Sequence, residues 1–162
     1  MTTPSQTVGP FFGFALPYEG DASPAQPGSP RALRVEGVVT DGAGEPVPDA
    51  ILEVWESDQF ARCRTDVEGA FHFSIEKPVR HADADGSAHA PHLNVTVFAR
   101  GLLRHLMTRM YFPDEAPANE LDPVLRLVAA DRRATLVARP SGGALQFDVR
   151  LQGDGETVFF AL

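Results

Sequence analysis

Between residues 32 and 112, short stretches with alternating apolar and polar side chains are separated by residues that favour turns. In the first stretch Leu33, Val35, Gly37 and Val39 alternate with more polar neighbours, and the sequence Asp-Gly-Ala-Gly then signals a turn. Because side chains on a strand point alternately to its two faces, each stretch predicts a half-buried strand. Several antiparallel strands at such short spacing indicate a mainly β protein, an antiparallel β-sandwich. Further strands are expected at 50–55, 62–65, 70–75, 92–99 and 104–112.

The first 31 residues have a different composition, rich in Pro, Gly and Ser. Six prolines prevent a regular helix there, namely Pro4, Pro10, Pro17, Pro24, Pro27 and Pro30. An apolar patch in the same segment would be unfavourable in water; it consists of Phe11, Phe12, Phe14, Leu16 and Tyr18. We therefore expect an extended N-terminal arm over residues 1–31 that packs on a partner chain, followed by a β-sandwich domain over residues 32–162.

The pattern changes after Phe112. Leu121, Val124, Leu125 and Val128 recur with a helical period, which predicts one short helical segment within residues 118–128. Pro123 fits only in the first turn of a helix, so this segment should be brief. A turn signal at 141–143 precedes a last strand, expected over residues 145–151.

Bulk properties limit the classes of partner and compartment. The 162 residues suit one domain, and a net charge of −8 argues against binding nucleic acid, which requires basic surface. The single cysteine, Cys63, cannot form an internal disulfide, and no secretory signal or bilayer-spanning apolar run is present. We therefore expect a cytoplasmic protein. Cys63 lies between Arg62 and Arg64, which leaves open a thiol with a lowered pKa.

The stretch from His89 to Arg100 contains an incomplete metal-binding pattern. A strand with two histidines two residues apart presents both imidazoles on one face, but here His92 is followed at that spacing by Asn94, a weak ligand. One histidine does not make a metal site, and we expect His92 to be half-buried and bonded to backbone. A 2-His-1-carboxylate triad from His81, Asp83 and either His92 or His105 is the alternative; a polar loop is the favoured interpretation.

Short motifs along the whole chain resemble the intradiol ring-cleavage dioxygenases. That family's ligand strand has the pattern Arg-Pro-x-His-x-His, in which His89 stands in place of the arginine, His92 matches the first histidine and Asn94 replaces the second. Within the family, the missing ligands and the C-terminal tail resemble non-catalytic alpha chains rather than catalytic beta chains. Other matching segments follow in the family's order at 5–11, 52–55, 64–66, 110–112 and 147–153.

The resemblance implies a reaction and a cofactor. Family members use ferric iron, held by two tyrosinates and two histidines, and the two-chain enzymes open protocatechuate between its hydroxyls to give 3-carboxy-cis,cis-muconate. At the tyrosine positions this chain has Phe60 and the tyrosine-free segment 79–81, while Tyr111 lies in a core-strand motif. The expected cofactor is therefore Fe(III) in a homologous catalytic beta subunit, with none bound by this chain. The two chains would form a hetero-oligomer with protocatechuate at their shared interface.

The same resemblance implies which residues reach that substrate. Gly9 and Pro10 are the expected pocket-lining residues, since Gly allows close backbone approach and Pro fixes a turn. Thr7 and Phe11 flank them. Arg100 is expected near the substrate, because a guanidinium pairs well with a carboxylate. Exposed aromatic side chains are expected to anchor the partner, namely Phe12, Phe14, Phe159 and Phe160.

Two other functions remain open from the sequence alone. The segment from Gly37 to Ala50 is typical of β-sandwich modules that bind carbohydrate or join larger proteins without an enzymatic role. A stand-alone dioxygenase is disfavoured by the missing ligands. A β-sandwich binding module would not need the arm at residues 5–11 or the Arg100-Gly101 segment.

Overall fold

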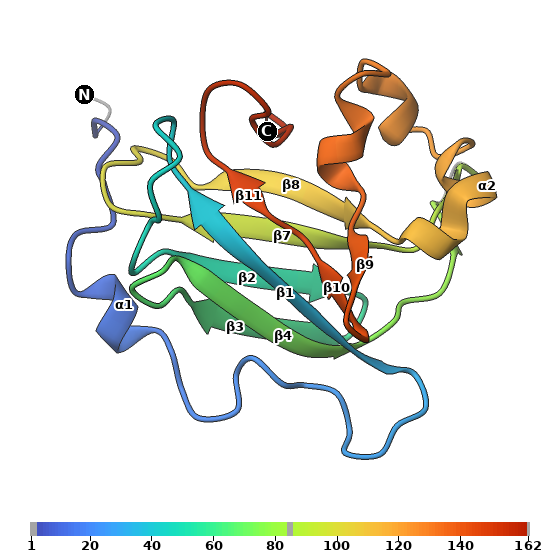
Figure 1. Ribbon diagram of the computed structural model, residues 1–162, viewed down its shortest axis with the longest axis horizontal. Helices are drawn as coiled ribbons and strands as arrows, with labels where there is room; N and C mark the ends of the chain where they lie inside the picture. The colour runs from blue at the N-terminus through green and yellow to red at the C-terminus, as the bar shows by residue number, and fades with distance from the viewer. Residues whose placement is uncertain (1–2, 84–85, 162) are drawn as a thin grey trace.

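Two β-sheets packed face to face form the body of the protein in the computed structural model, which describes residues 3–83 and 86–161 (Figure 1). Met1, Thr2 and Leu162, the ends of the two expected segments, lie outside the described residues. The first sheet is antiparallel throughout, with its strands in the order β3-β2-β7-β8. Their bounds are Gln59–Arg64 for β3, Ile51–Glu56 for β2, His92–Phe98 for β7 and Leu106–Tyr111 for β8.

The second sheet is built around β1, Ala32–Thr40, which pairs antiparallel with β4, Ala70–Glu76. Short parallel pairs join β1 to two C-terminal strands, and an outer strand completes the sheet. The expected β-sandwich is confirmed, with these parallel pairs as an addition that alternation alone does not predict. The C-terminal strands are β9 at Arg139–Ser141, β10 at Ala144–Gln146 and β11 at Val149–Arg150.

A close backbone crossing explains why the expected last strand, 145–151, is divided into β10 and β11. The amide of Phe147 donates to the carbonyl of Glu36 at 2.8 Å, so the chain passes directly over β1. A Cβ at Gly37 would lie 1.9 Å from the carbonyl oxygen of Phe147, so only glycine permits this crossing. Phe147 itself is buried in the core between the sheets.

The helical segments are all short. The helical period over 118–128 is interrupted: α2, Ala116–Asn119, ends before Pro123, and a 3-10 turn at Leu125–Leu127 follows. Further 3-10 turns lie at Pro113–Glu115 and Arg133–Leu136. Within residues 3–83 and 86–161, no helix has the length and apolar composition needed to cross a bilayer.

The arm runs along the edge of its own sandwich, beside β3 and β4 (Figure 1). It contains α1, Phe12–Ala15, and Arg62 donates from Nη1 to the carbonyl of Leu16 at 2.8 Å. The amide of Ser74 donates to the carbonyl of Ala22 at 2.8 Å. Of the four aromatic side chains expected to be exposed, Phe14 is exposed; its contact with a partner stays a prediction. Phe12 is buried, and Phe159 and Phe160 pack partly against the core clusters, because the sandwich itself covers them.

Candidate functional site

The N-terminal end of β7 holds His92 in a closed environment. Only 1% of the residue is exposed, and its Nδ1 lies 2.9 Å from the carbonyl of Ala90. Burial lowers the pKa of His92 to about 4, because the imidazolium would lose its hydration there. His92 is thus a neutral buried histidine bonded to backbone, as expected, although more deeply buried than the sequence suggests.

Two further histidines and a carboxylate surround it; we call His81, His89, His92 and Glu56 the histidine cluster. The three imidazole centroids lie 5.2 to 5.9 Å apart. Glu56 is buried at the end of β2, with one oxygen 3.7 Å from Nδ1 of His81 and the other 3.9 Å from Nε2 of His92. Burial raises the pKa of Glu56, and positive charge at His81 opposes that shift.

A hairpin that the sequence did not predict brings two of these histidines into place. It consists of β5, His81–Ala82, and β6, Ala88–His89. His89 is buried, and its Nε2 lies 2.9 Å from a carboxylate oxygen of Asp83. A hairpin of two-residue strands has too few residues to show a period, so the pattern of alternation could not reveal it.

Asp122 links the residues next to the histidine cluster to β8 and to the 3-10 turn at Leu125–Leu127. Its Oδ1 accepts from the hydroxyl of Tyr111 at 2.9 Å and from the amide of Leu125 at 2.8 Å, and its Oδ2 accepts from the amide of Ala90 at 3.0 Å. Burial alone would raise the pKa of Asp122, but these hydrogen bonds outweigh it and hold the pKa below its usual value. Burial raises the pKa of Tyr111, so its expected structural role fits its surroundings.

The donors at this end of β7 do not fit ferric iron. Asn94, at the second ligand position, donates to Glu56 at 3.4 Å, and Phe60 packs on Trp55 with ring centroids 4.5 Å apart. Asp83 bonds His89 instead of joining His81 in a triad, and His105 packs on the ring of Phe98. In the part of the chain that the structure describes, no group of three or more His, Cys, Asp or Glu side chains is placed to hold a metal.

Cys63 has no feature of a reactive thiol. It is buried in the core, and burial raises its pKa rather than lowering it, so the open interpretation of an activated cysteine is wrong. Its Sγ lies 3.4 Å from the carbonyl of Arg64. Cys63 is therefore a small core residue on β3.

At the other end of β7, the structure brings together segments that are far apart in sequence; we call Thr7, Gly9, Pro10, Arg100 and Gly101 the arm edge. The hydroxyl of Thr7 accepts a hydrogen bond from the amide of Gly101 at 3.1 Å, although 94 positions separate them. Gly9 has φ 78°, a left-handed conformation that favours glycine, and Pro10 is exposed. Phe11, which follows, is 77% exposed.

Arg100 lies on the surface just beyond β7, with a side chain that is 57% exposed. Its Nε is 2.9 Å from Oδ2 of Asp49, a residue that sequence reasoning did not single out. A small cavity of about 160 Å³ lies between the arm and the turn that follows β7, lined in part by Val8 and Leu103. The predicted site residues therefore lie on the surface at one edge of the molecule, and a small cavity remains beside them.

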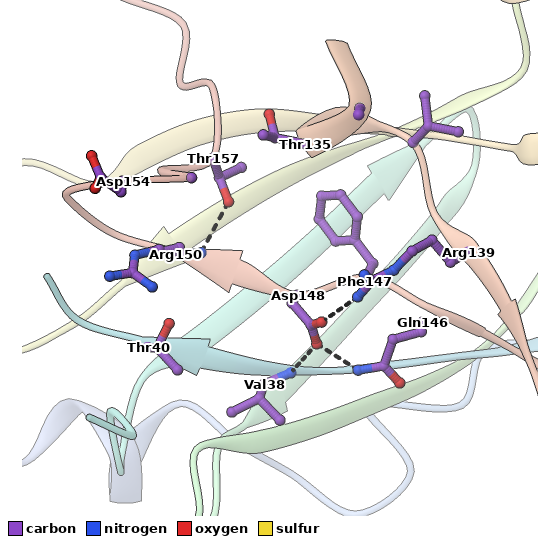
Figure 2. Close-up of a pocket in the computed structure, with 13 residues that line it drawn as sticks. Val38, Thr40, Thr135, Arg139, Gln146, Phe147, Asp148, Arg150, Asp154 and Thr157 are labelled. Carbon is purple, nitrogen blue, oxygen red and sulfur yellow. Dashed lines mark hydrogen bonds and ion pairs between the residues drawn. The ribbon is translucent and has the colours of Figure 1, made fainter. Parts of the chain in front are cut away.

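A separate cavity of about 680 Å³ lies beside β1 and β11 (Figure 2). Its polar groups mainly bond one another: Asp148 accepts from the amide of Val38, from Gln146 and from Arg139. The amide of Arg150 donates to the hydroxyl of Thr157 at 2.9 Å. This network fixes the crossing of the C-terminal strands over β1, and we assign it a structural role.

Comparisons with known proteins find this chain similar to the intradiol dioxygenases and, by sequence, to protocatechuate 3,4-dioxygenase alpha chains. No protein-family model matches the sequence. The protocatechuate 3,4-dioxygenase alpha chain of Burkholderia cepacia is 43% identical, with the alignment covering 98% of this chain and 96% of that relative. The beta chain of the same organism's enzyme is 29% identical over 76% of this chain and 65% of the relative. The solved structure of hydroxyquinol 1,2-dioxygenase from Pseudomonas putida DLL-E4 has a TM-score of 0.65 at 20% identity, covering 91% of this chain and 65% of that one.

Proposed function

Because this chain belongs to the family of protocatechuate 3,4-dioxygenase alpha chains, we propose that it completes the active site of a homologous catalytic beta chain. In this proposal the beta chain holds the ferric iron, and the two chains form a hetero-oligomer with protocatechuate at their interface. The reaction opens the ring between its two hydroxyls to give 3-carboxy-cis,cis-muconate. This chain contributes shape, exclusion of water and a contact to the substrate's carboxylate.

The separation of the two ends of β7 is the observation that carries the proposal. The strand has seven residues, so the histidine cluster and Arg100 are separated by about 20 Å or more. An arginine side chain spans far less than that distance. Arg100 therefore cannot reach the degenerate ligand position of its own chain, which supports a substrate contact in another subunit's pocket.

The chemistry of the arm edge fits a pocket wall. Gly9 and Pro10 present a turn with little side-chain bulk, which allows backbone to approach a bound ring closely. Thr7 ties this turn to Gly101 and so to Arg100. With a net charge of −8, the chain has no overall attraction for an anionic benzoate, so a local guanidinium must supply it.

Steady-state oxygen uptake of the co-purified two-chain complex tests the proposal. Arg100→Ala should raise the KM for protocatechuate about tenfold while kcat changes little, since one charge-assisted hydrogen bond is worth about 1.5–3 kcal/mol. Arg104→Ala is the matched control, because Arg104 is an exposed arginine on the same turn. A KM that Arg100→Ala leaves at the control's value would remove Arg100 from the substrate pocket.

A further inference from the structure

Asp49, in the turn just before β2, combines two unfavourable features. Its φ is 65°, a left-handed conformation adopted by only one other non-glycine residue, Ser57, among those that the structure describes. Its Oδ1 is buried and has no hydrogen-bond partner. Strained backbone and unpaired buried polar atoms gather at functional positions, where surrounding structure holds them in place.

The other oxygen of Asp49 forms an ion pair with Arg100. Oδ2 lies 2.9 Å from Nε of Arg100, and the aspartate side chain is only 18% exposed. Arg100 is exposed at the arm edge, where its guanidinium would otherwise rotate freely in water. A largely buried carboxylate at a fixed backbone position therefore limits the orientations of an exposed arginine.

The ion pair with Asp49 is made at Nε of Arg100, so the two terminal nitrogens of the guanidinium can bind another group. A guanidinium carries five N–H donors, of which Nε supplies one and the two terminal nitrogens supply four. Within residues 3–83 and 86–161, no ion pair joins the terminal nitrogens of Arg100 to a carboxylate. Two parallel N–H groups at that end match the two oxygens of a carboxylate. Anchoring at Nε thus presents the part of Arg100 best suited to bind a benzoate.

A cavity of about 450 Å³ adjoins this pair and connects it to the arm edge. Asp49, Arg100 and Gly101 line it together with the apolar side chains of Pro48 and Leu102. Gly101 also donates its amide to Thr7. The carboxylate, the guanidinium and the arm are therefore parts of one continuous wall.

We propose that Asp49 is a positioning residue, which holds Nε of Arg100 so that the terminal nitrogens meet the carboxylate of protocatechuate. The inference rests on the proposed function, since Arg100 must contact substrate for its orientation to matter. It differs from a simple surface ion pair, in which Asp49 would only neutralise Arg100 and compete with the substrate's carboxylate. These two roles change the KM in opposite directions.

Kinetics of the co-purified complex distinguish them, with Asp49→Gly, Arg100→Ala and the double variant compared in oxygen uptake. Asp49→Gly removes the anchor and relaxes the left-handed backbone, and Asp49→Asn serves as a second variant that keeps the side chain's shape and also tolerates this φ. We expect Asp49→Gly to raise the KM about fivefold at unchanged kcat, Asp49→Asn to raise it less, and the double variant to match Arg100→Ala alone.

Four results would overturn the inference. A lower KM in Asp49→Gly would show competition instead of positioning, and an additive double variant would show that Asp49 does not act through Arg100. An Asp49→Gly complex with the unaltered KM, beside an Arg100→Ala complex with a raised one, would reject the positioning role while the proposed function stands. No effect of Arg100→Ala would instead reject the proposed substrate contact, and the positioning role with it.

Discussion

The two ends of β7 have opposite properties. At its N-terminal end, His89, His92, Glu56 and Asp122 are buried. The carboxylate of Asp122 accepts hydrogen bonds from both side chain and backbone. At its C-terminal end, Arg100 is exposed, Asp49 is strained and has an unpaired oxygen, and the arm lies across the turn. The position where the family's ligands would lie has become part of the scaffold, while the far end has the unsatisfied groups that a binding surface requires.

The same difference gives two kinds of expected mutational effect. Changes in the histidine cluster and its support should lower the stability of this chain by itself. Changes at the arm edge should leave that stability almost unaltered and act on the complex. Measuring both quantities for each variant therefore tests whether the two ends are as distinct as their structures indicate.

The largest effect is expected for Asp122→Ala. Asp122 is 0% exposed and its carboxylate accepts several hydrogen bonds, so its removal leaves the hydroxyl of Tyr111 and buried amides unpaired. We expect the free energy of unfolding to fall by about 3–5 kcal/mol. Urea denaturation of the isolated chain measures this. Asp131→Ala, at an exposed position, should stay within about 0.5 kcal/mol of the unaltered chain, and an equally small effect at Asp122 would contradict a structural role.

Acid should lower the free energy of unfolding through His92, at the N-terminal end of β7. Its pKa is about 4 in the folded chain, against about 6.5 when unfolded. The unfolded chain therefore binds more protons between those values, and the free energy of unfolding should fall by about 3 kcal/mol as pH drops from 7 to 4. Glu56 shifts stability in the opposite direction because its pKa is raised.

A difference measurement isolates His92 from these other groups. Asn keeps a donor near the position of Nδ1, so the comparison is between the unaltered chain and His92→Asn. The stability gap between them should narrow as pH falls through the window from about 6.5 to about 4. A gap that stays constant across that range would mean that His92 is charged, or solvated, in the folded chain.

Gly9→Ala should act only on the complex. An added Cβ meets no atom within 4 Å, but φ 78° is unfavourable for alanine by about 1 kcal/mol, so the arm's turn should shift. We expect kcat/KM for protocatechuate to fall about fivefold. Gly20→Ala is a matched control, with φ 81° and the same free space farther along the arm. Equal losses in the two variants would remove any special role of Gly9.

The smallest effect is expected for Thr7→Val, which removes one exposed hydrogen bond to the amide of Gly101. Its loss should cost about 0.5–1 kcal/mol of local stability. Hydrogen exchange at the Gly101 amide should accelerate about two- to fivefold, while Thr7→Ser, which keeps the hydroxyl, should retain the original rate. Unchanged protection in Thr7→Val would mean that the arm is held on the turn by other contacts.

Much of the sandwich follows from alternation along the chain. The strands expected over 32–112 lie within a few residues of their expected bounds, because each has one face in the core. The division of the last strand does not follow from it, since it depends on a backbone crossing at Gly37 from a distant segment. The short helical segment expected within 118–128 is present as α2 and a 3-10 turn, which Pro123 and the carboxylate of Asp122 separate.

The candidate site was predictable in part. The motif resemblance gave Thr7, Gly9, Pro10 and Arg100, and the structure places Thr7 against the residue after Arg100. No sequence pattern identified Asp49, whose importance lies in a positive φ and an unpaired oxygen that only coordinates reveal. Glu56 and Asp122 were missed for a similar reason: each becomes notable only through burial among groups distant in sequence.

Iron content and protocatechuate-dependent oxygen uptake, measured for the isolated chain beside its complex with a homologous beta chain, test the central claim most directly. The claim is that the histidine cluster at the N-terminal end of β7 is structural, and that the arm edge at its C-terminal end serves a partner chain. It predicts iron and turnover in the complex and neither in the isolated chain. Iron binding with ring cleavage by the isolated chain would contradict it, and would show that the donors around His92 rearrange to hold the metal.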